Sequence, residues 1–202
     1  MNIVEYAKFK KMFGGGSGSD TPVANDTVKQ LIEGTITDIS DDKATSVRNY
    51  AFYRNKQVVS VDFPKATSIG ECAFQACDNL ANINIPNVTS IGQYAFQNCS
   101  KLRLTSLPRG INSLDLHAFS GCIKLTITRI PSSIMSIGNC AFYSNSGLTT
   151  LTFEGRPTSI HTNAFNSCGN LTTINVPWAE GAVANAPWGA TKATINYNYT
   201  GG

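Results

Sequence analysis

The sequence predicts a repeat solenoid, in which short parallel β-strands, one from each coil of 22 or 23 residues, stack side by side between non-repeat caps. The first observation is an Ala-Phe pair that recurs at steps of 22, 22, 23, 23 and 23 residues, with its Phe at Phe52, Phe74, Phe96, Phe119, Phe142 and Phe165. The second is a column of small polar or thiol residues three positions after each Phe, namely Asn55, Cys77, Cys99, Cys122, Asn145 and Cys168. The third is an aliphatic column three positions further on, namely Val58, Leu80, Leu102, Leu125, Leu148 and Leu171. Self-similarity at a fixed period is the signature of a repeat architecture.

A tripeptide of apolar, polar and apolar residues follows the aliphatic column and predicts a short β-strand. It is Ile83-Asn84-Ile85 in the second copy, and a Pro follows it in most copies. Its first position is Thr105 in the third copy and Thr128 in the fourth, and Glu154 replaces the Pro in the fifth. A helical-hairpin repeat needs about 33 residues or more, whereas a period of roughly 20 to 29 residues with one strand per coil is typical of a leucine-rich solenoid.

No coil of this size is expected to be stable alone. About five buried apolar side chains per coil contribute roughly 1.5–3 kcal/mol each, while every ordered residue loses roughly 1–2 kcal/mol of backbone entropy. Stability must therefore come from stacking coil on coil, with parallel strands about 4.8 Å apart and energies that add between nearest neighbours.

The repeat carries a specific resemblance. The pattern Leu-x-x-Ile-x-Ile-Pro, Thr-Ser-Ile-Gly and Ala-Phe-x-x-Cys resembles the BspA-like, or Treponema-type, class of leucine-rich repeats over about Val47 to Pro177. That class includes bacterial surface adhesins, protist surface proteins and phage or gut-bacterial proteins, so the resemblance implies a solenoid with an interaction role. One departure from the common leucine-rich pattern is that the Asn or Cys column precedes the next strand instead of following it. A hydrogen-bonded ladder along that column is therefore an inference.

The sequence divides into four segments: an amphipathic helix at 1–13, a Gly/Ser-rich linker at 14–26, the solenoid at 27–177 and a C-terminal cap at 178–202. The helix is predicted because Ile3, Tyr6, Phe9 and Phe13 recur three to four residues apart. Two interpretations of it stay open. It is either a docking peptide on a flexible tether, or a segment that folds back on the solenoid or has no fixed structure.

Both ends of a solenoid expose apolar residues that need a cover. At the N-terminal end a degenerate coil is expected between Thr27 and Ile39, ahead of the first full repeat. At the C-terminal end the repeat gives way to a segment that contains both tryptophans. We expect four of its residues to form a lid on the last coil, with an aromatic ligand site as the alternative: Trp178, Val183, Trp188 and Ile195.

Composition excludes several function classes. Charged residues are only 14% of the chain, against about 25% in a typical globular protein, so the surface must be built from Ser, Thr and Asn. A net charge of +3 and a pI near 8.5 do not predict nucleic-acid binding. No stretch has the length and apolarity of a membrane span. The N-terminus lacks the pattern of a secretory signal, which favours cytoplasmic synthesis.

The sequence shows no pattern for catalysis, a cofactor or a metal. Four of the six cysteines occupy the small-residue column, where Asn substitutes twice, so packing explains them. Cys72 and Cys140 are three coils apart, roughly 14 Å, which is too far for a disulfide. No Cys-x-x-Cys or His pair is present for zinc, and His117 and His161 have no nucleophile at a triad spacing. The sequence therefore predicts a protein that is not an enzyme.

Three hypotheses of function follow. The first is an interaction module that presents a rigid repeat surface to a protein or a glycan. The second is a structural or tail-associated protein of a phage particle, anchored by the helix at 1–13. The third is a fragment of a cell-surface adhesin, which the missing signal and wall anchor disfavour. The interaction surface would consist of the polar residue in the middle of each strand, namely Asp62, Asn84, Ser106, Arg129, Thr152 and Asn175.

Basic residues are concentrated in the third and fourth copies. Between Lys101 and Ile130 only Asp115 is acidic, whereas five residues are basic, namely Lys101, Arg103, Arg109, Lys124 and Arg129. From these we take Lys101, Arg103, Lys124 and Arg129 as a candidate contact for an acidic glycan or an acidic protein face. The alternative is a charged surface that serves solubility.

Overall fold

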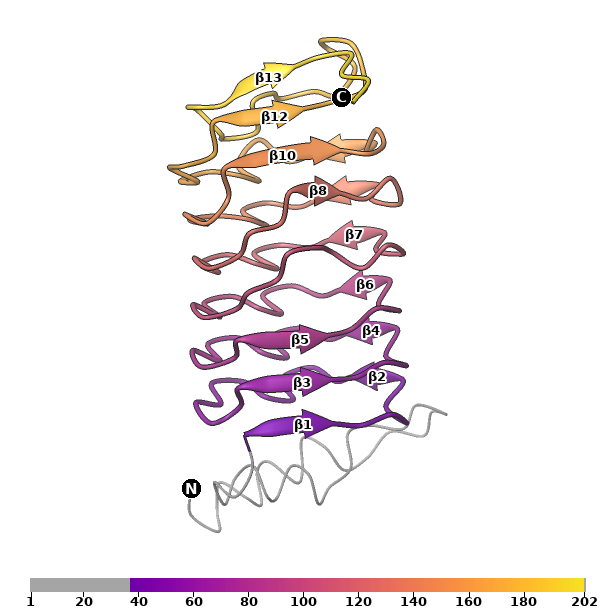
Figure 1. Cartoon of the computed structure of the whole chain (residues 1–202), viewed down its shortest axis with the longest axis vertical. Coiled ribbons are helices and arrows are strands. Elements are labelled where there is room, and N and C mark those ends of the chain that lie inside the picture. Colours follow the sequence, from indigo (N-terminus) through magenta and orange to yellow (C-terminus); the bar gives the residue numbers. More distant parts are fainter. Residues whose placement is uncertain (1–36, 202) are drawn as a thin grey trace.

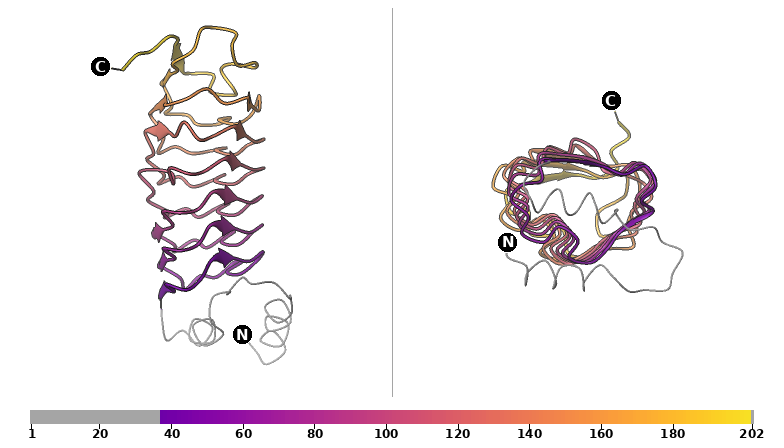
Figure 2. Two further views of the ribbon diagram at one scale, coloured as in Figure 1. Left: turned by 90° about the vertical axis from the view of Figure 1, so that its right-hand side faces the viewer. Right: turned by 90° about the horizontal axis from the view of Figure 1, so that it is seen from below.

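The computed structural model describes residues 37–201, which form a column of stacked coils without a helix (Figure 1). The predicted helix at 1–13, the linker at 14–26 and most of the degenerate first coil lie outside the described residues. We number the coils from the Ala-Phe pairs, so that coil one begins at Phe52 and coil six at Phe165. In the view along the solenoid axis, successive coils lie on top of one another and outline a flattened tube (Figure 2). The predicted solenoid is confirmed.

The side that faces the viewer in Figure 1, called the front face below, carries two parallel sheets. The first consists of β1 (Asp38–Ser40), β3 (Ser60–Asp62) and β5 (Asn82–Asn84). The second consists of β8 (Arg129–Ile130), β10 (Thr150–Phe153), β12 (Thr173–Asn175) and β13 (Thr194–Asn196). Within each sheet, equivalent residues of successive coils lie opposite one another, as Val61 does with Ile83 and Leu151 with Ile174.

A third sheet, called the back sheet below, extends along the whole column behind the front face, with its strands running in the opposite direction (Figure 1). Its six strands are β2 (Ser46–Val47), β4 (Ser68–Ile69), β6 (Ser90–Ile91), β7 (Ser113–Leu114), β9 (Ser136–Ile137) and β11 (Ser159–Ile160). In each strand the Ser lies on the outer side and the aliphatic residue is buried. The prediction of one strand per coil leaves this sheet out, because two residues are too few to show an alternating pattern.

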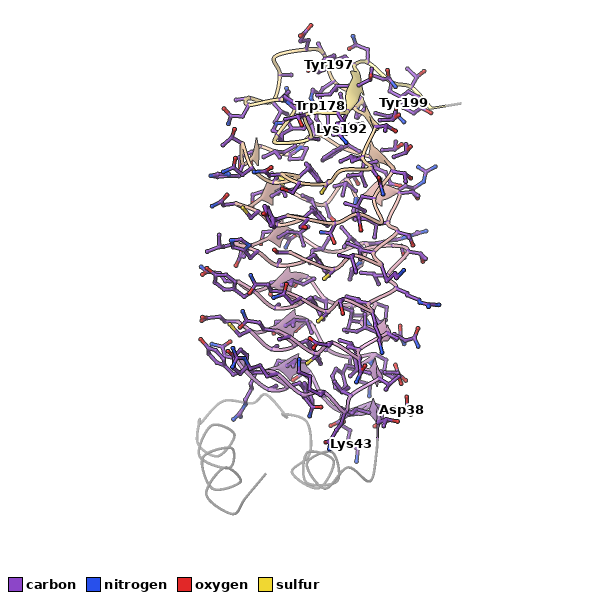
Figure 3. The ribbon with its side chains drawn as sticks, turned by 90° about the vertical axis from the view of Figure 1, so that its left-hand side faces the viewer. Asp38, Lys43, Trp178, Lys192, Tyr197 and Tyr199 are labelled. Atoms are coloured by element: carbon purple, nitrogen blue, oxygen red, sulfur yellow. The ribbon has the colours of Figure 1, made fainter. Side chains whose placement is uncertain are left out.

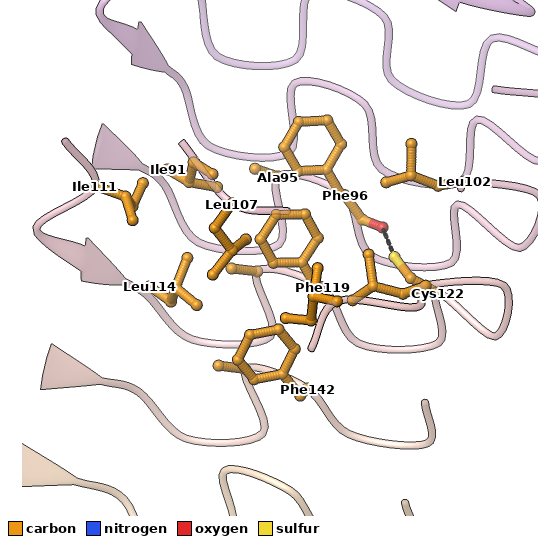
Figure 4. Packing of buried hydrophobic residues seen from close by; sticks show 14 of the residues in the cluster. Ile91, Ala95, Phe96, Leu102, Leu107, Ile111, Leu114, Phe119, Cys122 and Phe142 are labelled. Atoms are coloured by element: carbon orange, nitrogen blue, oxygen red, sulfur yellow. Dashed lines mark hydrogen bonds between the residues drawn. The ribbon is translucent and has the colours of Figure 1, made fainter. Parts of the chain in front are cut away.

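The core is an uninterrupted stack of six phenylalanine rings, one from each coil. Neighbouring centroids are between 5.0 and 5.9 Å apart, with interplanar angles no larger than 11°. Figure 4 shows three of these rings, Phe96, Phe119 and Phe142, among the aliphatic residues around them. All six rings are fully buried, so the Ala-Phe period in the sequence is the period of the core.

The small-residue column forms a hydrogen-bonded ladder inside the core. The Cys122 thiol donates to the Phe96 carbonyl at 3.0 Å (Figure 4), and Asn145 uses its Nδ2 in the same way toward the Phe119 carbonyl at 2.8 Å. Burial raises the pKa of the Cys77 and Cys122 thiols to about 12, so both keep the proton that they donate. All six cysteines are free thiols. The inferred ladder is thus present, and it explains why Asn and Cys alternate at this position.

The turn that contains each Ala-Phe pair includes residues in the left-handed region of backbone space. In coils one to six the residue two positions after the Phe has a positive φ, namely Arg54, Ala76, Asn98, Gly121, Ser144 and Ser167. Alternate N–H groups of this turn donate to the equivalent turn of the following repeat. The Phe52 N–H, for example, donates to the Ala73 carbonyl at 2.7 Å. A residue with a Cβ loses roughly 1–2 kcal/mol in this conformation, and Gly121 alone in this column avoids the cost.

We expect Ala76→Gly to stabilise the chain by about 0.5–1 kcal/mol, because the strain relieved at its φ of 56° exceeds the extra entropy of Gly in the unfolded chain. Urea unfolding checks this. The matched control is Ala73→Gly in the same turn, where φ is not positive and the methyl group is fully buried. That control should be destabilising, and a loss of stability in both variants would contradict the assignment of strain to Ala76.

The front face is interrupted at coil three, which contributes no strand to it. The backbone of residues 105–107 makes no hydrogen bond with β5 or β8 in the part of the chain that the structure describes. The sequence is irregular here, because the apolar residue after the column Leu moves forward by one position in coils three and four, to Leu104 and Ile127, and coil four keeps only the two-residue strand β8. A shift of one residue reverses which side chains face the core. Thr105 accordingly points outward, and pairing with β5 is lost.

The C-terminal segment continues the solenoid. β13 pairs with β12 in parallel and in register, with Ile174 opposite Ile195. Trp178, Val183 and Trp188 are buried and Ile195 is half-buried, so the four residues expected to form the lid pack on the last coils. Figure 3 places Trp178 at this end of the column and Asp38 at the opposite end. The indole of Trp188 also donates to the Ala184 carbonyl at 2.7 Å.

Candidate functional site

The polar column predicted from the sequence lies on the front face. Asp62 is opposite Asn84 in the first sheet, and Thr152 lies between Arg129 and Asn175 in the second. The sixth predicted residue, Ser106, belongs to coil three and is not in a strand, so the strand predicted there is wrong. Its side chain is nevertheless exposed on the same face.

Several members of this column hydrogen-bond to one another. Asn84 Nδ2 donates to Asp62 Oδ1 at 2.7 Å, and Asn175 Nδ2 donates to Thr152 Oγ1 at 3.1 Å. Asn196 Nδ2 in turn donates to Asn175 Oδ1 at 2.7 Å. Asn175 is only 7% exposed because β13 pairs with the strand that carries it, so little of its side chain is open to a partner.

Where coil three departs from the sheet, the front face is hollowed. A hollow of about 340 Å³, called the coil-three hollow below, lies between β5 and the segment that replaces the missing strand. Its walls are mainly apolar, with Asn84, Ser106 and Arg109 as the polar residues, and the apolar ones are Ile83, Ile85, Pro86, Leu104, Leu107 and Pro108. Ile83 is half-buried in spite of its position in a strand, since no strand covers it on this side.

A second hollow of about 200 Å³ adjoins the first and shares Ser106, Leu107 and Arg109 with it. Its other side is formed by Arg129, Pro131 and Glu154. Arg129 Nη1 lies 3.4 Å from Glu154 Oε1, but both side chains are largely exposed, so this ion pair contributes little to stability. Together the two hollows form a depression across coils three and four, with Arg109 shared between them and Arg129 in the wall of the second.

The structure divides the predicted basic cluster. Lys101 donates from Nζ to Asn79 Oδ1 at 2.8 Å, along the turn that precedes the strands. Arg103 and Lys124 are exposed and form no ion pair within residues 37–201. Of the four cations chosen from the sequence, only Arg129 lines the depression, whereas Arg109, which the choice omitted, lines both hollows. The sequence feature that could have identified Arg109 is its position directly after Pro108, at the end of the irregular segment.

The two histidines are placed differently. His117 is half-buried and stacks on Tyr94 with centroids 5.3 Å apart, and burial lowers its pKa. His161 is exposed. Within the described residues, no group of three or more His, Cys, Asp or Glu side chains is arranged to hold a metal ion. No helix in residues 37–201 has the length and apolarity to cross a membrane.

The repeat matches a known family model. The model is described as "BspA type Leucine rich repeat region (6 copies)" and matches residues 33–145 and 67–181. No curated protein matches the chain.

Two solved structures share the fold. A leucine-rich repeat protein of T. pallidum is 25% identical and superimposes with a TM-score of 0.62, over 69% of this chain and 72% of that protein. The pneumococcal vaccine antigen PcpA is 16% identical with a TM-score of 0.56, over 80% of this chain. The chain spans only 41% of that antigen. The second likeness therefore shows the fold alone.

Proposed function

Since the chain belongs to the BspA-type leucine-rich repeat family, we propose that it is a non-enzymatic binding module that holds a partner protein on its front face. Repeat solenoids present extended surfaces because each coil adds one more set of side chains in register. The depression across coils three and four is the part of that surface best suited to bind, and it is the observation that carries this proposal.

The coil-three hollow has the make-up of a protein-binding hot spot. Such sites combine an apolar pocket that excludes water with a polar rim, and Arg is enriched in them. Here Leu104, Leu107 and Ile83 supply the apolar walls, and Arg109 supplies the rim. The hollow is also rigid, because stacked coils hold it on both sides, so little conformational entropy is lost when a partner enters.

The charge of the depression indicates the chemistry of the partner. Arg109 forms no ion pair within the described residues, and Arg129 is matched only by the exposed Glu154. A partner segment with a large apolar side chain next to an Asp or Glu would fill the apolar walls and pair with Arg109. A direct Arg–carboxylate contact in a partly desolvated hollow is stronger than one on an open surface.

An adhesin-like module is one form of the same activity, and the same face would serve it. The role in a phage particle depends on an anchor at residues 1–13, outside the described residues. Neither the fold nor the related proteins favour it over the binding module.

The proposal is tested by selecting peptides from a random display library on the immobilised full-length chain. We expect enriched peptides to contain a large apolar residue beside Asp or Glu. Their affinity should fall about tenfold or more for Arg109→Ser and for Ser106→Trp, which fills the hollow. It should also fall when the salt concentration rises from about 0.05 M to about 0.5 M.

Matched controls are available at the C-terminal end of the column, where Lys192→Ser removes an exposed cation and Thr191→Trp adds an exposed indole. Both controls should bind the peptides as the parent chain does. Peptides that bind all four variants equally would place the contact elsewhere and overturn the proposal.

A further inference from the structure

A polar groove lies on the side of the solenoid that carries the back sheet, and we propose that it binds a neutral saccharide. The groove has a volume of about 530 Å³ and runs along the solenoid axis from coil two to the C-terminal segment. Its polar lining comes from successive coils and includes Gln93, Asp115, Ser136, Asn139, His161 and Asn185. None of these residues belongs to the front face, so this inference is independent of the function proposed above.

The groove arises from a substitution at one repeat position. The residue that directly follows the back-sheet strand is Gly70, Gly92 and Gly138 in three coils, but it is Asp115 in coil three and His161 in coil five. The register of β7, β9 and β11 places the last three of these in successive coils. Two side chains therefore flank a coil that has none, and they are separated by two strand spacings, about 10 Å.

A side chain at Gly138 would crowd the backbone of coil three. A Cβ on Gly138 would lie 3.0 Å from the carbonyl carbon of Asp115 and from the carbonyl oxygen of Leu114. The backbone of coil four thus lies directly on that of coil three. The floor of the groove is formed by this backbone and by the backbone of Ile137 and Ile160, whose side chains are buried in the core.

The flanking side chains offer complementary hydrogen-bonding groups. The Asp115 carboxylate makes no hydrogen bond or ion pair with any described residue, and partial burial raises its pKa. His161 accepts the Asn163 N–H on Nδ1 at 3.1 Å, so in the neutral ring the proton is on Nε2, which is left as a donor. Between them Asn139 accepts the Cys140 thiol on Oδ1 at 3.3 Å and keeps both N–H groups of its amide for a ligand.

This set of groups fits a polyol better than an ion. Each sugar hydroxyl both donates and accepts, and the groove provides an acceptor at Asp115, donors at His161 and Asn139, and serine hydroxyls that do both. No Lys or Arg lines the groove, so an acidic sugar would meet the Asp115 carboxylate without a compensating cation. The volume lies within the roughly 300–1,000 Å³ of small-molecule sites.

The test is saturation-transfer NMR on the full chain. The probes are neutral trisaccharides of glucose, galactose and mannose, with trigalacturonate as the acidic probe and putrescine as the amine probe. We expect signal transfer to at least one neutral trisaccharide and none to trigalacturonate. Absence of transfer to every neutral trisaccharide, or stronger transfer to putrescine, would overturn the proposal.

Variants locate the site. Asp115→Ala and His161→Ala should each weaken binding of the responding trisaccharide about tenfold, the effect of losing one good hydrogen-bonding partner in a small site. The control Asp42→Ala removes an exposed carboxylate at the N-terminal end of the described solenoid, outside the groove, and should leave binding unchanged. Ser106→Trp should also leave it unchanged, which separates this site from the front-face depression. Equal affinity for Asp115→Ala, His161→Ala and the parent chain would refute the assignment of the groove.

Discussion

Phe96→Ala should lower the free energy of unfolding by about 3–5 kcal/mol, the usual cost of deleting a buried aromatic side chain. Phe96 is fully buried and stacks between Phe74 at 5.3 Å and Phe119 at 5.1 Å, so its removal leaves a cavity within the continuous ring stack. Coils on both sides lose a contact, and in a solenoid these nearest-neighbour contacts are the main source of stability. Urea unfolding monitored by circular dichroism measures the loss.

The control for Phe96 is Asn84→Ala on the front face. Asn84 is exposed and its one side-chain hydrogen bond reaches Asp62 on the surface, so its removal should cost about 0.5 kcal/mol or less. Comparable losses for Phe96→Ala and Asn84→Ala would mean that the ring stack does not hold the coils together.

Asn145→Ala should lower the free energy of unfolding by about 2–3 kcal/mol, because it leaves a cavity and deprives a buried carbonyl of its donor. Asn145 Nδ2 donates to the Phe119 carbonyl at 2.8 Å in the core. Without it, that carbonyl keeps only the backbone bond from Cys122, which is long at 3.4 Å. Chemical denaturation of the two proteins under reducing conditions gives the difference.

Asn145→Cys is the informative partner of that variant. Four other coils place a Cys at this position, and each thiol donates to the equivalent carbonyl at 2.9 to 3.0 Å. The exchange also removes Asn145 Oδ1, a buried oxygen without a hydrogen-bond partner. Asn145→Cys should therefore be at least as stable as the parent chain. If Asn145→Cys lost as much free energy of unfolding as Asn145→Ala, the hydrogen bond to the Phe carbonyl would not be the reason for Cys and Asn at this repeat position.

The parts of the fold that the sequence predicts well are those that every coil repeats. The Phe column, of which Phe96 is one member, recurs at a fixed step, and such a step can be built only by stacking. The use of either Cys or Asn at this position, as in Cys122 and Asn145, also has a single explanation in the structure, because each side chain donates to the equivalent Phe carbonyl of the preceding coil. Repetition thus makes local patterns reliable here.

The parts that the sequence predicts poorly are single departures from the repeat. Leu104 occupies a position one residue early and coil three has no strand on the front face, whereas coil four, with the same shift at Ile127, keeps the two-residue strand β8. Asn175 has the pattern of an exposed strand residue, but β13, which comes from a segment without the repeat motif, covers it. In both cases the outcome depends on the neighbouring coil, which a single-coil pattern does not include.

The candidate sites follow the same rule. The repeat pattern predicts Ser106 as a site residue. Arg109, in contrast, belongs to an irregular segment and lines the depression only because coil three has no front-face strand. Asp115 and His161 are unremarkable in the sequence. They form a groove because the register of the back sheet places them on either side of Gly138.

Amide hydrogen exchange of the full chain, measured with and without a saturating front-face peptide from the display selection, tests the central claim most directly. If the depression across coils three and four holds the partner, protection should increase at residues 82–86 and 104–109, which line the coil-three hollow. Residues 136–139 and 159–161, on the back of the solenoid, should not change. Added protection confined to the back of the solenoid, or spread evenly over all coils, would contradict the claim that this depression is the binding site.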